Sequence, residues 1–254
     1  HGITPNPCIE CNRHLKFDRL IRRARELGFD AVATGHHARI RDVGGSLRVV
    51  RGEDAAKDQS YVVHMISGDD LAYVLFPVGD MQKSEVRSLA ARAHLRSTTG
   101  RGGFLGARMQ FHPAEVVDAT GAVIGRVDAV ELVTPGQRRG LGLGGGDKRY
   151  AVDVDVDSRR VTVGNDADLM TAETLVTQLV WPHGTDAAAV NRARVLVQGS
   201  AHGSRHAATV NVEGDRVVLV WERPQRRISP GQTVVFYDST DTAVLGGGIV
   251  TRGD

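Results

Sequence analysis

Cysteine is scarce in this sequence, which has only two among 254 residues, Cys8 and Cys11. A secreted scaffold held together by disulfides needs many more, so that class of protein is excluded. So few cysteines are typical of a reducing compartment, and we expect a cytoplasmic protein.

Long apolar runs are missing as well. No stretch approaches the ~18 consecutive apolar residues of a membrane helix, so we expect no membrane partner. The sequence opens at His1 without an initiator Met and without a charged-then-apolar signal segment. We therefore expect it to begin inside a longer gene product.

Neither sign of charge dominates. There are 32 basic and 30 acidic residues, for a net charge of +2, which neither demands nor excludes a nucleic-acid partner. Hydrophobic residues make up 41% and charged residues 24% of the chain. This composition is typical of a globular protein and excludes collagen-like, coiled-coil and wholly disordered chains.

The first hundred residues alternate between helix and strand patterns. Apolar residues three and four apart predict a helix over residues 16–27, capped by Asn12, and a buried strand follows at 31–34. Two further helices are expected to begin at Ser67 and Ser84. This order indicates a doubly wound α/β domain, in which ligands bind beyond the carboxyl ends of the strands.

From about Gly102 onward, short strands dominate. Turn signals predict hairpins around residues 118–121, 157–158 and 214–215. Strands at this spacing favour small barrels or sandwiches, with a boundary near residues 181–184. We expect three domains: an α/β domain over 1–98, a central mainly-β domain over 99–183 and a C-terminal β-barrel over 184–254.

The two cysteines lie in residues 4–12, with the sequence TPNPCIECN. The prolines are expected to hold this segment extended and to present the thiols on a stiff loop. Four interpretations are open: a zinc site, which would need ligands from elsewhere; a redox pair; a sulfur-carrying thiolate; or two inert thiols. We expect no metal site, because the chain has no second cysteine pair.

Three other segments carry chemical groups. Residues 33–36 read ATGH, where Gly35 would let a ligand approach and His36 would be either a ligand contact or a structural histidine. Residues 57–61 read KDQSY, either a set suited to phosphates and base edges or a solvated loop. Residues 134–146 read TPGQRRGLGLGGG, which could wrap a nucleic-acid backbone or form a turn between strands.

Taken together, six ordered motifs resemble one family. They are residues 4–12, 33–36 and 57–61, LFPVG at 75–79, GQRRGLG at 136–142 and LGGGI at 245–249. The chain resembles the bacterial tRNA-specific 2-thiouridylases over nearly its whole length. The resemblance implies a partial ATP-pyrophosphatase-type α/β domain, followed by a mainly-β central domain and a C-terminal β-barrel.

The resemblance also implies an activity. The family uses ATP, with Mg²⁺, to replace O2 of the wobble uridine of certain tRNAs with sulfur, and it takes the sulfur from a donor or relay protein. Adenylation turns the carbonyl oxygen into a leaving group, a cysteine persulfide delivers sulfur, and a second cysteine resolves the intermediate as a disulfide. The implied partners are therefore tRNA and a sulfur-relay protein.

Site residues follow from the same resemblance. Cys11 takes the nucleophile position, with Cys8 as a further catalytic candidate. The expected contacts are Asn6, Pro7 and Cys8 for the target base, Gly35 for ATP, and His36, Lys57, Asp58, Gln59 and Gln232 for tRNA.

The sequence departs from the family in four places. The Ser-Gly-Gly-x-Asp-Ser phosphate loop is absent, and the stretch with the family's other catalytic cysteine is missing, since residues 96–101 alone join the preceding helix to the β region. Cys8 stands where Asp is frequent, and residues 199–201 stand where a tRNA-facing Arg is expected. We therefore expect a truncated or degenerate 2-thiouridylase, or a tRNA-binding module without catalysis.

Overall fold

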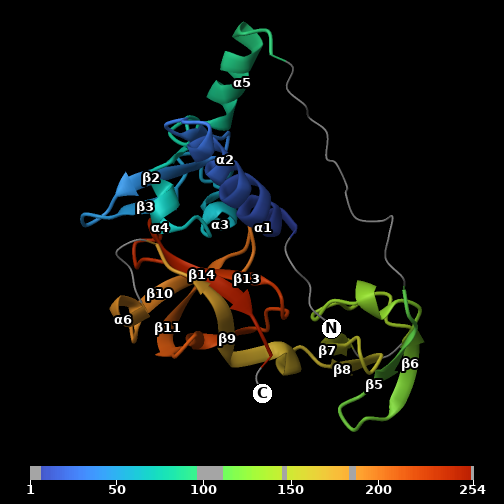
Figure 1. Ribbon diagram of the computed structural model, residues 1–254. Coiled ribbons are helices and arrows are strands. Elements are labelled where there is room, and N and C mark those ends of the chain that lie inside the picture. Colours follow the sequence, from blue (N-terminus) through green and yellow to red (C-terminus); the bar gives the residue numbers. More distant parts are fainter. Residues whose placement is uncertain (1–6, 96–110, 145–147, 183–186, 253–254) are drawn as a thin grey trace.

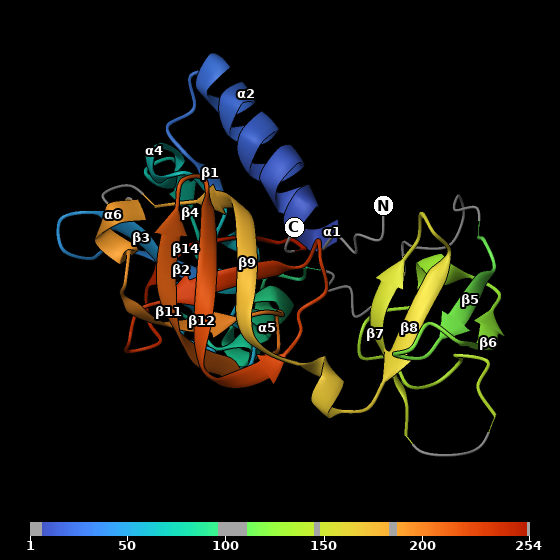
Figure 2. The same cartoon turned by 90° about the horizontal axis from the view of Figure 1, so that it is seen from below.

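The computed structural model describes residues 7–95, 111–144, 148–182 and 187–252, without the side chains of Pro7, Cys8 and Leu15. An α/β part lies against one side of a β-barrel, and a small β domain stands beside them (Figures 1 and 2). This agrees with the expected fold class, an α/β domain followed by a mainly-β domain and a barrel.

The α/β part contains short strands and helices. Its helical elements are α1 (Pro7–Glu10), η1 (Cys11–Arg19, a π-helix), α2 (Leu20–Glu26), α3 (Ser60–Val63), α4 (Gly68–Leu71) and α5 (Lys83–Arg92). Its strands are β1 (Val32–Ala33), β2 (Ala38–Asp42), β3 (Leu47–Arg51) and β4 (Val74–Leu75). The strands β1 and β4 form a parallel pair, while β2 and β3 form an antiparallel hairpin.

The expected start of the first helix was wrong. Helical structure begins at Pro7 and continues through η1 into α2, so the cysteine segment is not extended from Pro7 onward. The Asn12 side chain does not cap a helix as expected. Its amide Nδ2 instead donates to the carbonyl of Val62 at 2.8 Å. Proline suits the first position of a helix, where its missing N–H costs no hydrogen bond.

The two later helices begin close to the expected residues. Ser67 caps α4: its hydroxyl accepts from the backbone N–H of Asp70. The other helix, α5, begins at Lys83, where Gln82 and Glu85 form a capping box. None of the residues of α5 is buried, and the helix projects away from the barrel (Figure 1).

The central domain is a four-stranded sheet in the order β6-β5-β8-β7. Its elements are β5 (Ala114–Val117), β6 (Val123–Val127), η2 (Val130–Leu132), β7 (Tyr150–Asp155) and β8 (Arg160–Gly164). Both hairpins expected here are confirmed, with antiparallel pairing of β5 with β6 and of β7 with β8. The domain has its own apolar core, which draws no residue from the other two parts.

The barrel closes in the order β10-β11-β12-β9-β14-β13. Its elements follow η3 (Ala167–Leu169) and are β9 (Met170–Val180), α6 (Ala187–Val190), β10 (Arg194–Gln198), β11 (Arg205–Glu213), β12 (Arg216–Arg226), β13 (Thr233–Tyr237) and β14 (Val244–Val250). Strand β9 pairs with β12 and β14, so the barrel takes in residues ahead of the boundary expected at 183–184. The local sequence around Trp181 suggested a break, but strand pairing decides the boundary.

Strand β13 joins the α/β part to the barrel. Side chains alternate along a strand, and here both faces are buried. Val234 and Phe236 point into the barrel core, whereas Val235 and Tyr237 belong to the core of the α/β part. The α/β part and the barrel therefore share apolar packing.

None of the helices in the described part of the chain has the length and hydropathy of a membrane span.

Candidate functional site

A cavity of about 320 Å³ opens where the α/β part meets a loop of the barrel. We call it the interdomain cavity. Its lining brings together the expected tRNA-contact segment and residues from other elements: His37, Lys57, Asp58, Gln59, Lys83 and His202. Three residues that the sequence motif placed side by side thus form part of one concave surface.

Two lysines supply the positive charge of this cavity. Lys57 is exposed, and Lys83 lies at the start of α5, where its Nζ donates to Nε2 of His37 at 3.3 Å. Burial, followed by the charge of Lys83, lowers the pKa of His37, so this imidazole is neutral at pH 7. The cavity can therefore attract an anion through its lysines, while His37 orients one of them.

Asp58 does not face the cavity as a free carboxylate. Oδ2 accepts from Arg51 Nη1 at 2.7 Å and from the Ser60 hydroxyl at 2.8 Å, while Oδ1 accepts from the backbone N–H of Gly52 at 2.8 Å. The Asp58 side chain is 7% exposed. These contacts fix the loop that carries Lys57 and leave Asp58 little capacity for a ligand.

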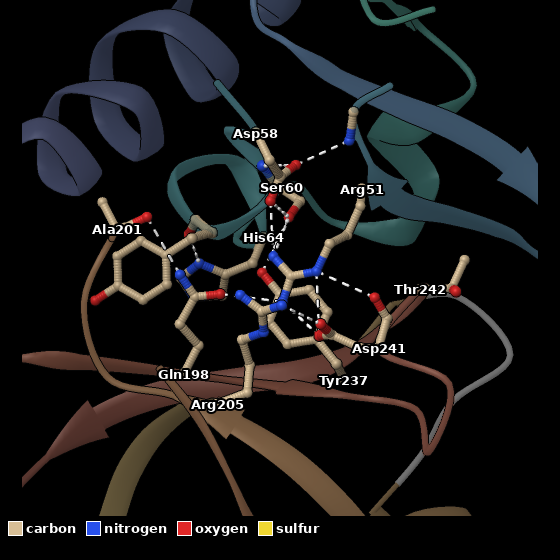
Figure 3. Close-up of polar contacts among 12 residues, drawn as sticks. Arg51, Asp58, Ser60, His64, Gln198, Ala201, Arg205, Tyr237, Asp241 and Thr242 are labelled. Carbon is tan, nitrogen blue, oxygen red and sulfur yellow. Dashed lines mark hydrogen bonds and ion pairs between the residues drawn. The ribbon is translucent and has the colours of Figure 1, made fainter. Parts of the chain in front are cut away.

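Arg51 connects that loop to the barrel (Figure 3). Its Nη2 donates to Asp241 Oδ1 at 2.6 Å and to Gln198 Oε1 at 3.1 Å. The guanidinium also stacks over the Tyr237 ring, 3.8 Å from its centroid. Burial raises the pKa of Tyr237 above its usual range, although Arg51 opposes this, so the phenol stays protonated.

Gln59 is held by the backbone of His37, the residue directly before β2. Its Oε1 accepts from the N–H of His37 at 2.9 Å, and its own N–H donates to the His37 carbonyl at 2.8 Å. Of the three expected tRNA contacts in this segment, Lys57 is the one with an exposed side chain.

His36 lies in an aromatic layer beneath η1. Its ring centroid is 5.7 Å from that of Phe17 and 5.8 Å from that of Phe76, and Nδ1 is hydrogen-bonded to the Thr34 hydroxyl at 2.8 Å. Burial, followed by the charge of Lys16, lowers the pKa of His36 to about 4. The imidazole is thus neutral and is 7% exposed.

Gly35 lies two residues beyond the end of β1 and is exposed. A Cβ atom built at this position meets nothing within 4 Å. A ligand can therefore approach the backbone closely here, as at other strand ends of α/β sheets.

Cys11 begins η1, is half-buried and forms no disulfide bond. The adjacent Asn12 is hydrogen-bonded to Val62, which lines the interdomain cavity. Phe17, six residues further along the same helix, packs on His36. The helix that carries Cys11 is therefore fixed both to the cavity wall and to the segment after β1.

The remaining expected site residues lie elsewhere in the fold or outside the described residues. Asn6 is among the latter, as are the side chains of Pro7 and Cys8. Gln232 directly precedes β13, next to Thr233, whose carbonyl accepts from the Tyr61 hydroxyl at 2.9 Å. Gln232 therefore lies beside a contact between barrel and α/β part.

Sequence reasoning missed four residues of this region: Arg51, Lys83, His37 and His202. Lys83 could have been noticed because the chain has only four lysines, and His37 because it follows His36. Arg51 is one of 28 arginines, so nothing in the sequence distinguishes it. Within the described ranges, no group of three or more His, Cys, Asp or Glu side chains could hold a metal ion.

Three family models match successive parts of the chain. Residues 1–102 match the "tRNA methyl transferase HUP domain", residues 102–165 the "tRNA methyl transferase PRC-barrel domain" and residues 171–250 the "Aminomethyltransferase beta-barrel domain". The matched ranges correspond to the α/β part, the central sheet and the barrel.

Several similar proteins are named tRNA-specific 2-thiouridylase MnmA. The tRNA-specific 2-thiouridylase MnmA of Chloroflexus aggregans is 44% identical over 269 residues, covering 99% of this chain and 74% of that protein. Those of Roseiflexus castenholzii and Mycolicibacterium paratuberculosis are each 39% identical, over 99% and 96% of this chain and 75% and 72% of their own lengths. The chain therefore belongs to the tRNA-specific 2-thiouridylase family.

Proposed function

We propose that this chain binds tRNA and carries the sulfur-attack position for 2-thiolation of the wobble uridine. The main observation behind this proposal is that the chain is 44% identical to a 2-thiouridylase across 99% of its length. The position of Cys11 supports it: this half-buried thiol lies on a helix that is bonded to the wall of a cationic cavity.

Within this proposal each site residue has a role. Lys57 contacts tRNA phosphate, while Asp58 and Gln59 hold its loop in place. His36 and Gln232 contact tRNA, Asn6, Pro7 and Cys8 contact the target base, and the open backbone at Gly35 contacts ATP. A neutral imidazole at His36 suits a hydrogen bond to a base better than an ion pair to phosphate, because its pKa lies near 4.

The proposed chemistry balances in three steps. The uridine O2 attacks the α-phosphorus of ATP, with Mg²⁺ on the phosphates, and pyrophosphate leaves. The terminal sulfur of a persulfide on the family's other catalytic cysteine, charged by a sulfur-relay protein, attacks C2, and AMP departs with the former O2. The Cys11 thiol then attacks the inner sulfur of that cysteine, which leaves the outer sulfur on C2 and forms a disulfide that an external thiol must reduce.

We further propose that these 254 residues alone are a truncated or degenerate copy that does not complete the cycle. Cys8 and Cys11 are their only cysteines, and they contain no Ser-Gly-Gly-x-Asp-Ser sequence. The match with the Chloroflexus aggregans protein spans 269 residues, more than this chain has, so that relative carries residues inside the matched region without a counterpart here.

The test is incubation of the chain with tRNA, ATP, Mg²⁺ and a persulfide-charged relay protein, followed by mass spectrometry of the nucleosides. We expect tRNA binding without appreciable 2-thiouridine. Appreciable 2-thiouridine that is lost in Cys11→Ser would support the role of Cys11 and contradict the proposed incapacity. Formation that is unchanged in Cys11→Ser and lost in Cys8→Ser would contradict the role of Cys11.

A second candidate function is a tRNA-binding module without catalysis. The favouring observation is that the barrel is closed and the central sheet has its own core, whereas the described α/β part keeps only one parallel strand pair. A gel shift with tRNA that weakens with salt supports this module. If no shift occurs even at low salt, both candidate functions fail.

A further inference from the structure

A second recess, of about 580 Å³, lies on the central domain. We call it the basic recess. Four cations line it together with apolar side chains: Arg138, Arg139, Lys148, Arg149, Ile124 and Leu143. Among the described residues, its lining contains neither an acidic nor an aromatic side chain.

The loop that presents the two central arginines is firmly fixed. Leu141 is buried in the domain core at 2% exposure. Gly142 has a φ of +63°, and a Cβ atom there would lie 1.9 Å from the carbonyl oxygen of Arg126, so only glycine fits. Gln137 closes the loop, since its Oε1 accepts from the Thr134 N–H and its Nε2 donates to the Arg139 carbonyl.

The four cations are not used by the fold. All are exposed, and among the described residues none forms an ion pair with a carboxylate. Hydrogen bonds from Thr120 and Ala122 lower the pKa of Asp118, and Arg149 lowers it further at longer range. Asp147 precedes Lys148 in the sequence but lies outside the described residues.

Like charges gathered around one recess repel each other in the free protein, so this arrangement is stabilised when an anion binds. An extended series of phosphates suits four separate cations on a pre-formed loop. The lack of an aromatic side chain favours contact with a backbone over stacking with bases. The central domain, which carries the recess, stands beside the α/β part and the barrel (Figures 1 and 2). The recess and the interdomain cavity share no lining residue.

We propose that the basic recess binds the phosphodiester backbone of the tRNA stem outside the anticodon loop. This inference rests on the proposed function, because it assumes that tRNA is the substrate. The recess then contacts tRNA independently of its sequence, so the chain binds a whole tRNA more tightly than a short anticodon stem-loop.

The experiment compares binding of whole tRNA and of an anticodon stem-loop, by fluorescence anisotropy between 50 and 200 mM salt, for the unaltered chain and for Arg138→Gln/Arg139→Gln. We expect the variant to bind whole tRNA roughly three- to tenfold more weakly, with a salt slope less steep by about 1 for each phosphate that the variant no longer neutralises. Binding of the stem-loop stays unchanged. The charge-matched control is Arg159→Gln/Arg160→Gln, at the far end of the β7–β8 hairpin and outside the recess lining, which should not alter the preference for whole tRNA.

The outcomes separate the two proposals. If neither RNA binds the unaltered chain, both the proposed function and this inference fail. If both RNAs bind but the Arg138/Arg139 variant and the control behave alike, the basic recess is not a tRNA site, while the proposed function survives. Inorganic triphosphate provides a further arm: a variant that loses triphosphate binding but keeps its tRNA affinity assigns the recess to free polyphosphates and overturns the inference.

Discussion

The guanidinium of Arg51 meets two carboxylates from distant parts of the chain, Asp58 at 2.7 Å and Asp241 at 2.6 Å. The Arg51 side chain is 14% exposed, so little water is available to replace a missing partner. Removing one of the two carboxylates leaves the guanidinium with a single charged partner where little water can replace the other, which costs more than the removal of a surface ion pair.

Asp58→Asn should therefore lower the free energy of unfolding by about 3 kcal/mol. The amide keeps the shape of the side chain but removes the charge that Arg51 faces. Urea unfolding followed by circular dichroism measures the change. The matched control is Asp215→Asn, in the exposed β11–β12 turn, where a change within about 0.5 kcal/mol is expected. Equal stability of the two variants would mean that the Asp58 carboxylate contributes no more to the fold than an exposed one.

Two histidines make stability depend on pH. Burial is the main cause that lowers the pKa of both His36 and His64 to about 4, whereas an unfolded histidine titrates near 6.5. Between these values the unfolded chain binds protons that the folded chain does not. The contribution is therefore complete above pH 6.5 and is lost as the pH falls towards 4.

We expect the free energy of unfolding to fall by about 2 kcal/mol per buried histidine between pH 7 and pH 5. Denaturant titrations at the two pH values give this difference. In His64→Gln the difference should shrink by about 2 kcal/mol, because this group no longer titrates. An acid-induced decrease as large as that of the unaltered chain would refute the role of His64.

Strand β14 illustrates how an element can be restricted by its neighbours. A Cβ atom at Gly247 would lie 2.6 Å from the carbonyl oxygen of Val234 and 2.7 Å from the His64 ring. Glycine at this position lets β14 pack against both β13 and the α/β part. Consecutive glycines at residues 246–248 are typical of a bulge or tight corner, but they do not indicate which neighbour approaches.

Gly247→Ala should lower the free energy of unfolding by about 1–3 kcal/mol, because the methyl group displaces backbone as well as a side chain. Thermal unfolding provides the measurement. Gly144→Ala is the control, since a Cβ atom there meets nothing within 4 Å and its φ is not positive. If both alanine variants unfold at the same temperature as the unaltered chain, the close packing at Gly247 does not constrain the fold.

Elements set by local chemistry were predictable, and those set by distant contacts were not. The hairpins around residues 157–158 and 214–215 formed as expected because turn residues separate alternating strands. The first helix began earlier than expected, and the Asn12 side chain bonds to Val62, 50 residues away, instead of capping it. The candidate site divides likewise: the Lys57–Gln59 motif was visible, but Arg51 and His202 reach it only through the fold.

At the scale of the whole molecule, the described residues pack into two separate bodies. The α/β part and the barrel share a core that includes Val235, Tyr237 and Val244. The core of the central domain contains residues from 114 to 163 only. The described contacts between this domain and the barrel are few and peripheral, such as the pair of Arg252 with Asp153 at 3.4 Å.

Scanning calorimetry should therefore resolve two transitions. Val161→Ala, at a fully buried position of the central core, should lower only one of them. Val235→Ala, equally buried in the shared core, should lower only the other. Each substitution removes the same two methyl groups, so each is expected to cost about 2 kcal/mol. A single transition that both variants shift would contradict this division.

The shared core has a consequence for synthesis on the ribosome. Ser60 and Tyr61 find partners in Tyr237 and Thr233, which are 177 and 172 residues further along. The α/β part must therefore wait, with its apolar face uncovered, until β13 has been synthesised. A stop codon shortly before β13 would thus leave the α/β part without its packing partners, and such nascent chains should depend on chaperones until β13 emerges.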